Sequence, residues 1–485
     1  MKFIVKLFPE ITIKSKPVRK RFIQRLQSNL QVTLRRLDES IKVRGLWDKV
    51  EVEVASEDAE LRLQMIDVMA ATPGILYSLE VEQHPLGSFD EVFQLTKDAY
   101  AERIKGKTFV VRVKRAGKHE FRSGDLERYI GGGLIEHCES AGVDLHNPDV
   151  KVKLEIRDQH LFVISHQHPG LGGYPLGSQE AVLSLISGGF DSVVASYMTM
   201  RRGCKTHFLF FNLGGRAHEI GVKQVALSLW QKYGSAARVK FVTVPFEEVV
   251  GEILQNVHHS QMGVVLKRMM LRAAEQVSDR MKLHAVVTGE SIAQVSSQTL
   301  PNLAVIDSVT NKLVLRPLIT MDKQDIIDIT RQIGAYDMAK NIPEYCGVIS
   351  DRPTTNAKIE RIEEEESGFD YEVLEQALQD AQVIAIDKIV ADVNAHAEIE
   401  ALTKVTDEQV IIDIRHTHEQ ERKPLNMPKC EVLKIPFFKL ESAFENLDHT
   451  KEYLLFCDKG MMSQLHAQSL QEKGYSNVRV YRPEG

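Results

Sequence analysis

The feature that most constrains the fold is a strand–loop–helix unit near the middle of the chain. An apolar stretch at 181–186 runs into Ser187-Gly-Gly-Phe-Asp-Ser192, and a helical stretch follows at 193–201. Two adjacent glycines let the backbone approach a phosphate closely, and the first N–H groups of a helix have no partner within the helix. The two serine hydroxyls add donors. This unit predicts an anion cradle at the end of a buried strand.

The loop differs from a Walker loop because no lysine follows its glycines. It resembles instead the pyrophosphatase loop of ATP-dependent adenylating enzymes, which cleave ATP between the α and β phosphates. That resemblance implies phosphate contacts from Ser187, Gly188, Gly189 and Ser192. Asp191 would orient magnesium or the attacking group, although an aspartate in the first turn of a helix is also an ordinary capping residue.

Apolar strands alternate with helical segments on both sides of the loop, which predicts an α/β multidomain protein with a doubly wound parallel sheet over residues 175–350. The expected strands are 181–186, 207–212, 239–244 and 285–288. Two smaller α+β units are expected before this sheet, over 1–75 and 76–168, with helices at 16–30, 58–71, 89–104 and 125–141. A charged stretch at 351–403 reads as an acidic helical linker, and 404–485 as a compact C-terminal α/β unit.

Charge is distributed unevenly along the chain. Residues 1–50 hold thirteen Lys/Arg against four Asp/Glu, whereas residues 351–400 hold four against fourteen. A basic front half indicates a polyanion-binding surface, although solvated helix faces would give the same count. The loop at 115–122 combines cations, glycine and Phe121, which suits phosphate contacts or stacking and equally an exposed tip.

No apolar run is long enough to cross a bilayer, and residues 1–14 alternate like a strand rather than forming a signal peptide. We therefore expect a cytoplasmic protein. The chain has five cysteines, at 138, 204, 346, 430 and 457. They form no CxxC pair and no zinc-type spacing, so neither a disulfide framework nor a structural metal is indicated.

Cys457 is the cysteine with the strongest local argument for reactivity. It directly follows the apolar strand at 453–456 and precedes a helical stretch, with Gly460 three residues later. Backbone N–H groups at such a turn lower a thiol pKa and hold an anionic persulfide. Cys346 lies between Pro343 and Gly347 in what reads as an exposed loop, and its residues alone leave a structural and a reactive role equally open.

The C-terminal unit, residues 404–485, resembles a rhodanese domain. Ile412-Asp-Ile-Arg415 and Glu419 match the early signature of that family, and Cys457 matches its persulfide position. Cys138, Cys204 and Cys430 are best interpreted as structural.

The complete order of units resembles the bacterial tRNA 4-thiouridine synthase family. Matching motifs are Ser187–Ser192, 211–215, 266–270, Thr288-Gly-Glu290, 294–298 and Pro343-Glu-Tyr-Cys-Gly347. The resemblance implies a ferredoxin-like first unit and a THUMP second unit that together bind tRNA. It also implies an ATP site lined by Leu185, Ile186, Lys267, Gly289 and Gln298, with Lys323 as a further phosphate contact.

The same resemblance implies a reaction. ATP, with magnesium, would adenylate the uridine at tRNA position 8, and a cysteine desulfurase would load sulfur onto Cys457 for transfer to give 4-thiouridine. Cys346 would then form a transient disulfide with Cys457 that a reductant must open. The family also supplies sulfur to the small carrier protein of thiazole synthesis.

Two other classes of protein are compatible with such a loop. A small-molecule adenylating ligase or amidotransferase would use the same loop, but it needs neither a basic front half nor a rhodanese unit. A non-catalytic RNA-binding scaffold would consume no ATP in the presence of tRNA, and the intact loop argues against it.

Overall fold

The structure is a computed structural model, and its chain divides into two compact units. One comprises Met1–Gln179 with Arg201–Cys204, and the other comprises Glu180–Met200 with Lys205–Gly485. The structure describes residues 1–213, 215–340, 342, 352–389 and 401–483, without the side chains of 215–217. In the last range it omits 407–408, 416–419, 421–422, 426, 428–429, 437–439, 441–442, 458–462, 464–465, 468–469 and 472.

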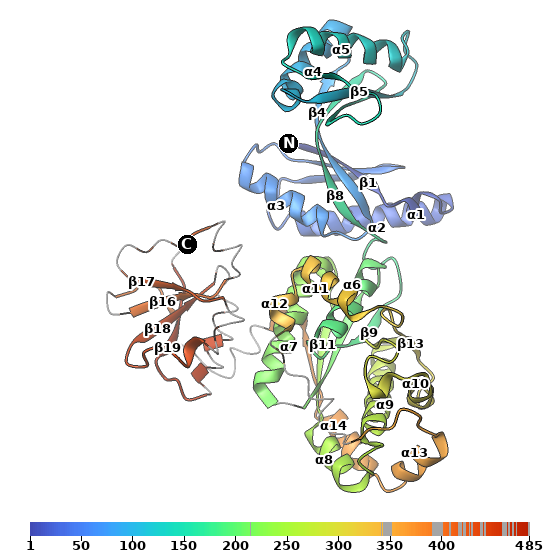
Figure 1. The fold of residues 1–485 in the computed structure, drawn as a ribbon, viewed down its shortest axis with the longest axis vertical. Helices are drawn as coiled ribbons and strands as arrows, with labels where there is room; N and C mark the ends of the chain where they lie inside the picture. Colours follow the sequence, from blue (N-terminus) through green and yellow to red (C-terminus); the bar gives the residue numbers. More distant parts are fainter. Residues whose placement is uncertain are drawn as a thin grey trace. The chain divides into compact units, whose positions relative to one another are not determined.

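The first unit is built on one sheet of eight strands, in the order β2-β3-β1-β4-β8-β7-β5-β6. The strands are β1 Lys2–Leu7, β2 Lys42–Gly45, β3 Lys49–Glu53, β4 Ile75–Pro85, β5 Thr108–Ala116, β6 Gly142–Val143, β7 Val150–Arg157 and β8 His160–Gly172. Figure 1 shows the long strands β4 and β8 running from the half that contains β1 into the half that contains β5. The expected units at 1–75 and 76–168 are therefore joined through this antiparallel pair.

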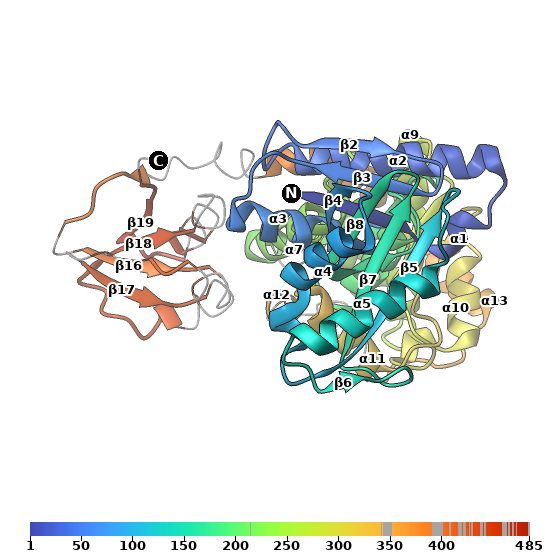
Figure 2. The ribbon, with the colours of Figure 1, turned by 90° about the horizontal axis from the view of Figure 1, so that it is seen from above.

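Five helices cover the sheet, namely α1 Pro9–Thr12, α2 Lys16–Leu34, α3 Ala59–Ala70, α4 Phe89–Ile104 and α5 Ser123–His137. Helices α4 and α5 lie side by side, as seen from above in Figure 2. The expected helix 125–141 ends earlier, because Cys138 adopts extended geometry and the N–H of Ala141 donates to Lys107 O across to the start of β5. Cys138 thus follows the helix instead of lying within it.

The second unit contains a six-stranded sheet in the order β13-β12-β9-β10-β11-β14. Its strands are β9 Val182–Leu185, β10 Thr206–Asn212, β11 Lys240–Pro245, β12 Ala285–Val287, β13 Leu313–Leu315 and β14 Gln382–Ala385. The first five pair in parallel, and β14 pairs antiparallel with β11 at the edge. The doubly wound parallel sheet predicted from the sequence is confirmed, with an added antiparallel edge strand.

Helices cover both faces of this sheet because successive residues of each strand point to opposite sides. Leu183 and Leu209 face a core shared with α8 and α9, whereas Ser184 bonds to Ser196 of α6 and Phe210 contacts His218 of α7. The helices are α6 Phe190–Arg201, α7 Gly215–Leu229, α8 Glu247–Asn256, α9 Met262–Met281, α10 Leu300–Asp307, α11 Lys323–Ile333, α12 Tyr336–Ala339, α13 Ile359–Glu366 and α14 Tyr371–Gln379. The described residues up to 389 also include a π-helical turn, Trp230–Gly234, and two 3-10 turns, Ser296–Gln298 and Ile386–Lys388.

The acidic stretch expected as a helical linker is helical over α13 and α14. Ile362, Phe369 and Leu374 are buried in the same core as α9, and β14 extends the sheet. Residues 352–389 therefore pack into the nucleotide-loop domain, while 390–400 lie outside the described residues.

The C-terminal part of the chain forms a five-stranded parallel sheet in the order β15-β19-β18-β16-β17. Its strands are β15 Ala401–Leu402, β16 Gln409–Asp413, β17 Glu431–Lys434, β18 Glu452–Phe456 and β19 Val478–Tyr481. Strand β18 pairs with β16 and β19 and is buried over Tyr453–Phe456. The described helices include none with the length and apolar character that a bilayer crossing requires.

Helix α3 provides a test of local stability in the first unit. The Asp58 carboxylate accepts hydrogen bonds from the N–H groups of Glu60 and Leu61. We expect Asp58→Ala to weaken the helix by about 1 kcal/mol, so that amide exchange in α3 accelerates about fivefold. Asp58→Asn, which keeps a capping oxygen, is the matched control. Equal acceleration in both variants, measured by hydrogen exchange, would contradict this account.

Candidate active site

The nucleotide loop between β9 and α6 is held open by a few local contacts. Ser192 Oγ accepts from Ser187 N at 3.2 Å and donates to Gly189 O at 3.0 Å, while Gly188 has φ +84°. That backbone conformation favours glycine. The hydroxyl of Ser192 therefore shapes the loop internally, and the start of α6 presents its first N–H groups. Leu185 ends β9, and Ile186 is buried.

A second segment meets this loop from the neighbouring strand β12. A Cβ atom added to Gly289 would lie 2.6 Å from Asp191 C and 2.7 Å from Ser192 N. Strand β9 lies between β10 and β12, and the chain leaves β9 for β10 before it returns to β12. Ligands of open parallel sheets bind at such switch points, beyond the carboxyl ends of the strands. Gly289 thus lies where a ligand of this fold is expected.

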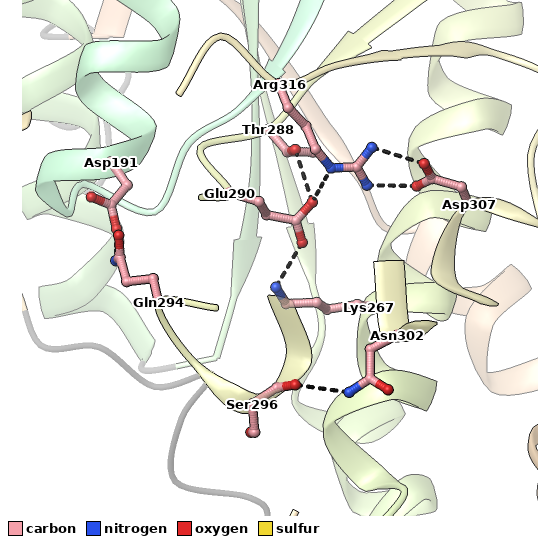
Figure 3. A network of polar contacts seen from close by, with 9 residues as sticks. All are labelled: Asp191, Lys267, Thr288, Glu290, Gln294, Ser296, Asn302, Asp307 and Arg316. Carbon is pink, nitrogen blue, oxygen red and sulfur yellow. Dashed lines mark hydrogen bonds and ion pairs between the residues drawn. The ribbon is translucent and has the colours of Figure 1, made fainter. Parts of the chain in front are cut away.

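Next to Gly289, the carboxylate of Glu290 lies in a buried ionic chain (Figure 3). It accepts from Lys267 Nζ and Arg316 Nε, each at 2.7 Å, and from Thr288 Oγ1 at 3.1 Å. Arg316 also forms a two-point ion pair with Asp307, at 2.8 and 2.5 Å. Burial raises the pKa of Glu290, but Lys267 and Arg316 outweigh it and lower the pKa from 4.5 to about 2. Glu290 is therefore ionised at neutral pH.

Asp191 in the first turn of α6 has cationic and amide partners. Lys323 Nζ, at the start of α11, lies 2.7 and 2.9 Å from its two carboxylate oxygens. Gln294 Nε2 donates to the same carboxylate at 2.7 Å. The carboxylate predicted to act in catalysis is thus held by two side chains from outside the loop.

Gln298 is the last residue of the segment 288–298, which follows strand β12. Its side chain is buried, and Oε1 has no hydrogen-bond partner among the described residues. Gln294 Oε1 is likewise buried without a partner in that part of the chain. The turn is fixed by Ala293, which has φ +61° and donates to Gln298 O at 3.0 Å. Gln294 contacts Asp191 of the nucleotide loop, and its buried acceptor and that of Gln298 suit a ligand that brings N–H or O–H donors.

Cys346 lies outside the described residues, as do 341 and 343–345, whereas Ile342 is described. A Cβ atom added to Gly188 would lie 2.5 Å from Ile342 Cδ1, so Ile342 covers the nucleotide loop.

Cys457 is buried directly after β18. The N–H of Ser463 donates to its sulfur at 3.4 Å, and Ser463 Oγ lies 3.5 Å away. On the adjacent strand, buried Asp413 forms a two-point ion pair with Arg415, whose guanidinium lies over Phe456. The predicted N–H contact to the sulfur is present at Ser463. Residues 458–462 and Glu419 lie outside the described residues.

Of the residues singled out in the sequence for a nucleotide site, Gly289 and Lys323 lie against Asp191 of the loop. Residues that the sequence reasoning did not assign to the site are Glu290, Gln294, Arg316 and Asp307. Glu290 and Arg316 each follow the end of a short apolar strand, a position that the sequence displays. Their mutual pairing depends on the β12–β13 register, which no single segment shows.

Comparisons with known proteins agree with this architecture. Family models match residues 2–77 (ThiI ferredoxin-like domain), 87–165 (THUMP domain), 177–371 (Thiamine biosynthesis protein, ThiI) and 397–483 (Rhodanese-like domain). The tRNA sulfurtransferases of Azotobacter vinelandii and Pseudomonas aeruginosa are 56% and 57% identical over 483 residues, with 100% of each chain covered. A solved 4-thiouridine synthetase–RNA complex with bound ATP has a TM-score of 0.69 and 25% identity, covering 79% of this chain and 99% of its own.

Fold and site define a multidomain α/β protein that joins a pyrophosphatase-type nucleotide loop to a rhodanese-like domain. The ferredoxin-like, THUMP and rhodanese units expected from the sequence are confirmed. The chain belongs to the tRNA sulfurtransferase family.

The close approach of Gly289 to the loop gives a test of the site. We expect Gly289→Ala to push the start of α6 away, because the added methyl group would overlap the backbone of Asp191 and Ser192. ATP affinity, measured by titration calorimetry, should fall at least about tenfold, or about 1.4 kcal/mol. Gly251→Ala in α8, where an added Cβ has no heavy atom within 4 Å, should bind ATP normally. Unchanged ATP affinity in Gly289→Ala would refute this geometry.

Proposed function

We propose that this protein transfers sulfur to a tRNA uridine, at position 8, to give 4-thiouridine at the expense of ATP. One observation carries the proposal. The same chain holds a nucleotide loop with a carboxylate at its helix start and a rhodanese-type cysteine whose sulfur accepts a backbone N–H. Activation of a nucleobase and delivery of sulfur are the two steps that these groups suit.

In the first step, uridine O4 attacks the α-phosphorus of ATP, pyrophosphate leaves, and the uridine becomes adenylated. The loop residues Ser187, Gly188, Gly189 and Ser192 bind the phosphates, while Lys267 and Lys323 contribute positive charge. We assign Leu185, Ile186, Gly289 and Gln298 to the ATP site. The buried Oε1 of Gln298 supports this assignment, since a donor from the ligand would satisfy it.

Magnesium fits this site through Asp191. Magnesium prefers oxygen ligands and is usually held by one or two carboxylates together with substrate phosphates. Groups of three or more potential ligands are absent from the described residues, so the phosphates would supply the remaining contacts. Magnesium would neutralise phosphate charge. Asp191 would exchange its contact with Lys323 Nζ for the metal, which leaves that ammonium group available to a phosphate.

In the second step, the terminal sulfur of a Cys457 persulfide attacks C4 of the activated uridine and AMP leaves. The thiolate of Cys346 then attacks Cys457 Sγ, which breaks the sulfur–sulfur bond and leaves a Cys346–Cys457 disulfide. An external dithiol reduces it, supplying two electrons and two protons. A cysteine desulfurase restores the persulfide. The N–H of Ser463 supports the persulfide assignment because it stabilises negative charge on sulfur.

We assign tRNA binding to residues 1–168. Helix α2 exposes Lys16, Lys20, Arg21 and Arg25 on one side, while its buried face packs on the sheet. Trp47 is exposed, and the guanidinium carbon of Arg19 lies 5.8 Å from the centroid of its ring. Cations and an exposed aromatic ring are the groups that contact phosphates and stack on bases. The solved relative was crystallised with RNA.

The loop at 115–122 in the THUMP region supports the same assignment. Arg115 lies over Phe121 and donates to His119 O, and His119 Nε2 lies 2.7 Å from Asp158 O. These contacts give the loop a defined shape, whereas a simple exposed tip would not need them.

The domain limits that we propose are 1–75, 76–168 and 404–485 for the first, second and C-terminal domains. The nucleotide-loop domain, expected over 175–350, extends to 389 because residues 352–389 pack into its core and its sheet. The alternative, a small-molecule adenylating ligase, leaves the basic front half and the rhodanese unit without a role. It predicts pyrophosphate release that is independent of tRNA, which separates the two ideas in one assay.

The proposed relay is tested with the full chain, unmodified tRNA, ATP, cysteine and a cysteine desulfurase. We expect Cys457→Ser and Cys346→Ser each to lower 4-thiouridine turnover at least about a hundredfold, since each removes a thiol with a covalent role. The absorbance of 4-thiouridine and the release of pyrophosphate are measured together. Cys204→Ser is the matched control and should keep normal turnover. Full turnover in either relay variant would overturn the sulfur route.

We further propose that Cys457 supplies sulfur to the small carrier protein of thiazole synthesis. This step needs the persulfide but not the nucleotide loop. We expect Asp191→Asn to abolish tRNA thiolation while it keeps thiocarboxylate formation on an adenylated carrier protein within about twofold. The Cys457 persulfide displaces AMP from the carrier, and a thiolate, that of Cys346 or of the external dithiol, then attacks Cys457 Sγ and releases the thiocarboxylate, so this reaction does not use the nucleotide loop. Mass spectrometry of the carrier detects the product. Loss of carrier thiolation in Asp191→Asn, or its retention in Cys457→Ser, would discard the idea.

A further inference from the structure

We propose that Glu290 is a positioning residue for the adenylation step, which holds the ammonium group of Lys267 toward the nucleotide. The inference rests on the proposed function and adds a residue to it. Glu290 lies immediately after Gly289, which packs closely against the start of α6, so its backbone follows directly on the segment that meets the nucleotide loop.

The contacts of Lys267 leave its ammonium group able to bind a ligand. Its side chain is 20% exposed, and within the described residues Glu290 Oε1, at 2.7 Å, is its hydrogen-bond partner. A lysine ammonium group has three N–H donors. One donor is fixed by Glu290, and the others are available to a ligand. A flexible side chain held at one point loses less entropy when it binds.

The remaining contacts of Glu290 fix its own position. Arg316 Nε and Thr288 Oγ1 both donate to Oε2, while Oε1 faces Lys267. Arg316 is held at its far end by the two oxygens of Asp307. Figure 3 shows Glu290 between Lys267 and Arg316. The carboxylate that orients Lys267 is therefore itself held on its other side.

The charges around Glu290 leave Lys267 able to attract a phosphate. A lone carboxylate beside a triphosphate would repel it and would attract Lys267 away from the ligand. Arg316 balances the negative charge of Glu290. The series Lys267, Glu290, Arg316 and Asp307 alternates positive and negative charges and has no net charge. Lys267 lies at one end of the series. Its positive charge consequently remains usable by a phosphate even though it is paired.

A positioning role differs from a purely structural role because a positioning residue acts on ATP binding through Lys267. We expect Glu290→Gln to raise the KM for ATP about tenfold, with a smaller change in kcat, because the loss of one charge-assisted contact is of that order. The KM for tRNA and the loading of sulfur on Cys457 should stay unchanged. Lys267→Gln should raise the KM for ATP by a similar factor.

The decisive measurement is the double variant. If Glu290 acts through Lys267, Lys267→Gln/Glu290→Gln should match Lys267→Gln alone in its KM for ATP, within about twofold. The proposal would be overturned if the double variant raised the KM for ATP by the product of the two single-variant factors. A normal KM for ATP in Glu290→Gln would overturn it as well. Asp307→Asn, which breaks the same series at its far end, is the matched control and should change the KM for ATP less than about threefold. An effect as large as that of Glu290→Gln would overturn the proposal by showing general disruption.

A second variant and a wild-type control distinguish the possible outcomes. If Glu290→Gln does not fold, Glu290→Asp is measured, because it keeps the charge but withdraws it from Lys267 by one methylene group. A normal KM for ATP in folded Glu290→Asp would then count against the proposal, and a raised KM would support it. Wild-type protein is assayed in parallel. Absence of tRNA-dependent ATP cleavage in wild type would refute the proposed function itself, whereas normal wild-type activity with an unaffected variant refutes only the role of Glu290.

Discussion

The parallel pairing of β9 with β10 on one side and β12 on the other is the constraint on which the site depends. The strands of a parallel pair end at the same edge of the sheet, so the segments that follow them meet there. The loop after β9 brings Gly188 and Asp191 to this edge, and the segment after β12 brings Gly289 and Glu290. The φ of +84° favours glycine at 188, and glycine is required at 289 because a side chain there would overlap the backbone in the first turn of α6.

Ionic pairing makes this crowded edge energetically possible. Glu290 and Arg316 are both largely removed from water, and each would be costly to bury alone. Lys267 and Arg316 lower the pKa of Glu290 from its ordinary 4.5 to about 2. Between about pH 2 and pH 4.5 the carboxylate therefore binds fewer protons in the folded chain than in the unfolded chain. Its contribution to stability is therefore fully present above about pH 4.5 and is lost as the pH falls toward 2.

Sequence patterns predicted those helices and strands that are specified by residues within the element itself. The helix at 89–104 has the predicted limits, since Ser88 and Glu91 form a capping box at its start. Strand β8 was not anticipated, because Pro169, Gly170 and Gly172 resemble a loop in the sequence. In the structure that segment pairs with β4 through two register shifts, which accommodate the irregular residues. The packing of 352–389 into the nucleotide-loop domain was missed for a related reason, since its many acidic residues hide the buried Ile362, Phe369 and Leu374.

The sequence by itself determined the loop, its glycines and hydroxyls, and the cysteine that follows a buried strand, because each of these depends on neighbours within a few residues. It also contained Glu290, Arg316 and Lys323 as charged residues beside strand ends or a helix start. Only the tertiary structure decided their partners: Glu290 with Lys267 and Arg316, and Asp191 with Lys323, across separations of 23, 26 and 132 residues. The energy of a buried charge is set by what surrounds it in space, and that surrounding exists only once the strands have paired.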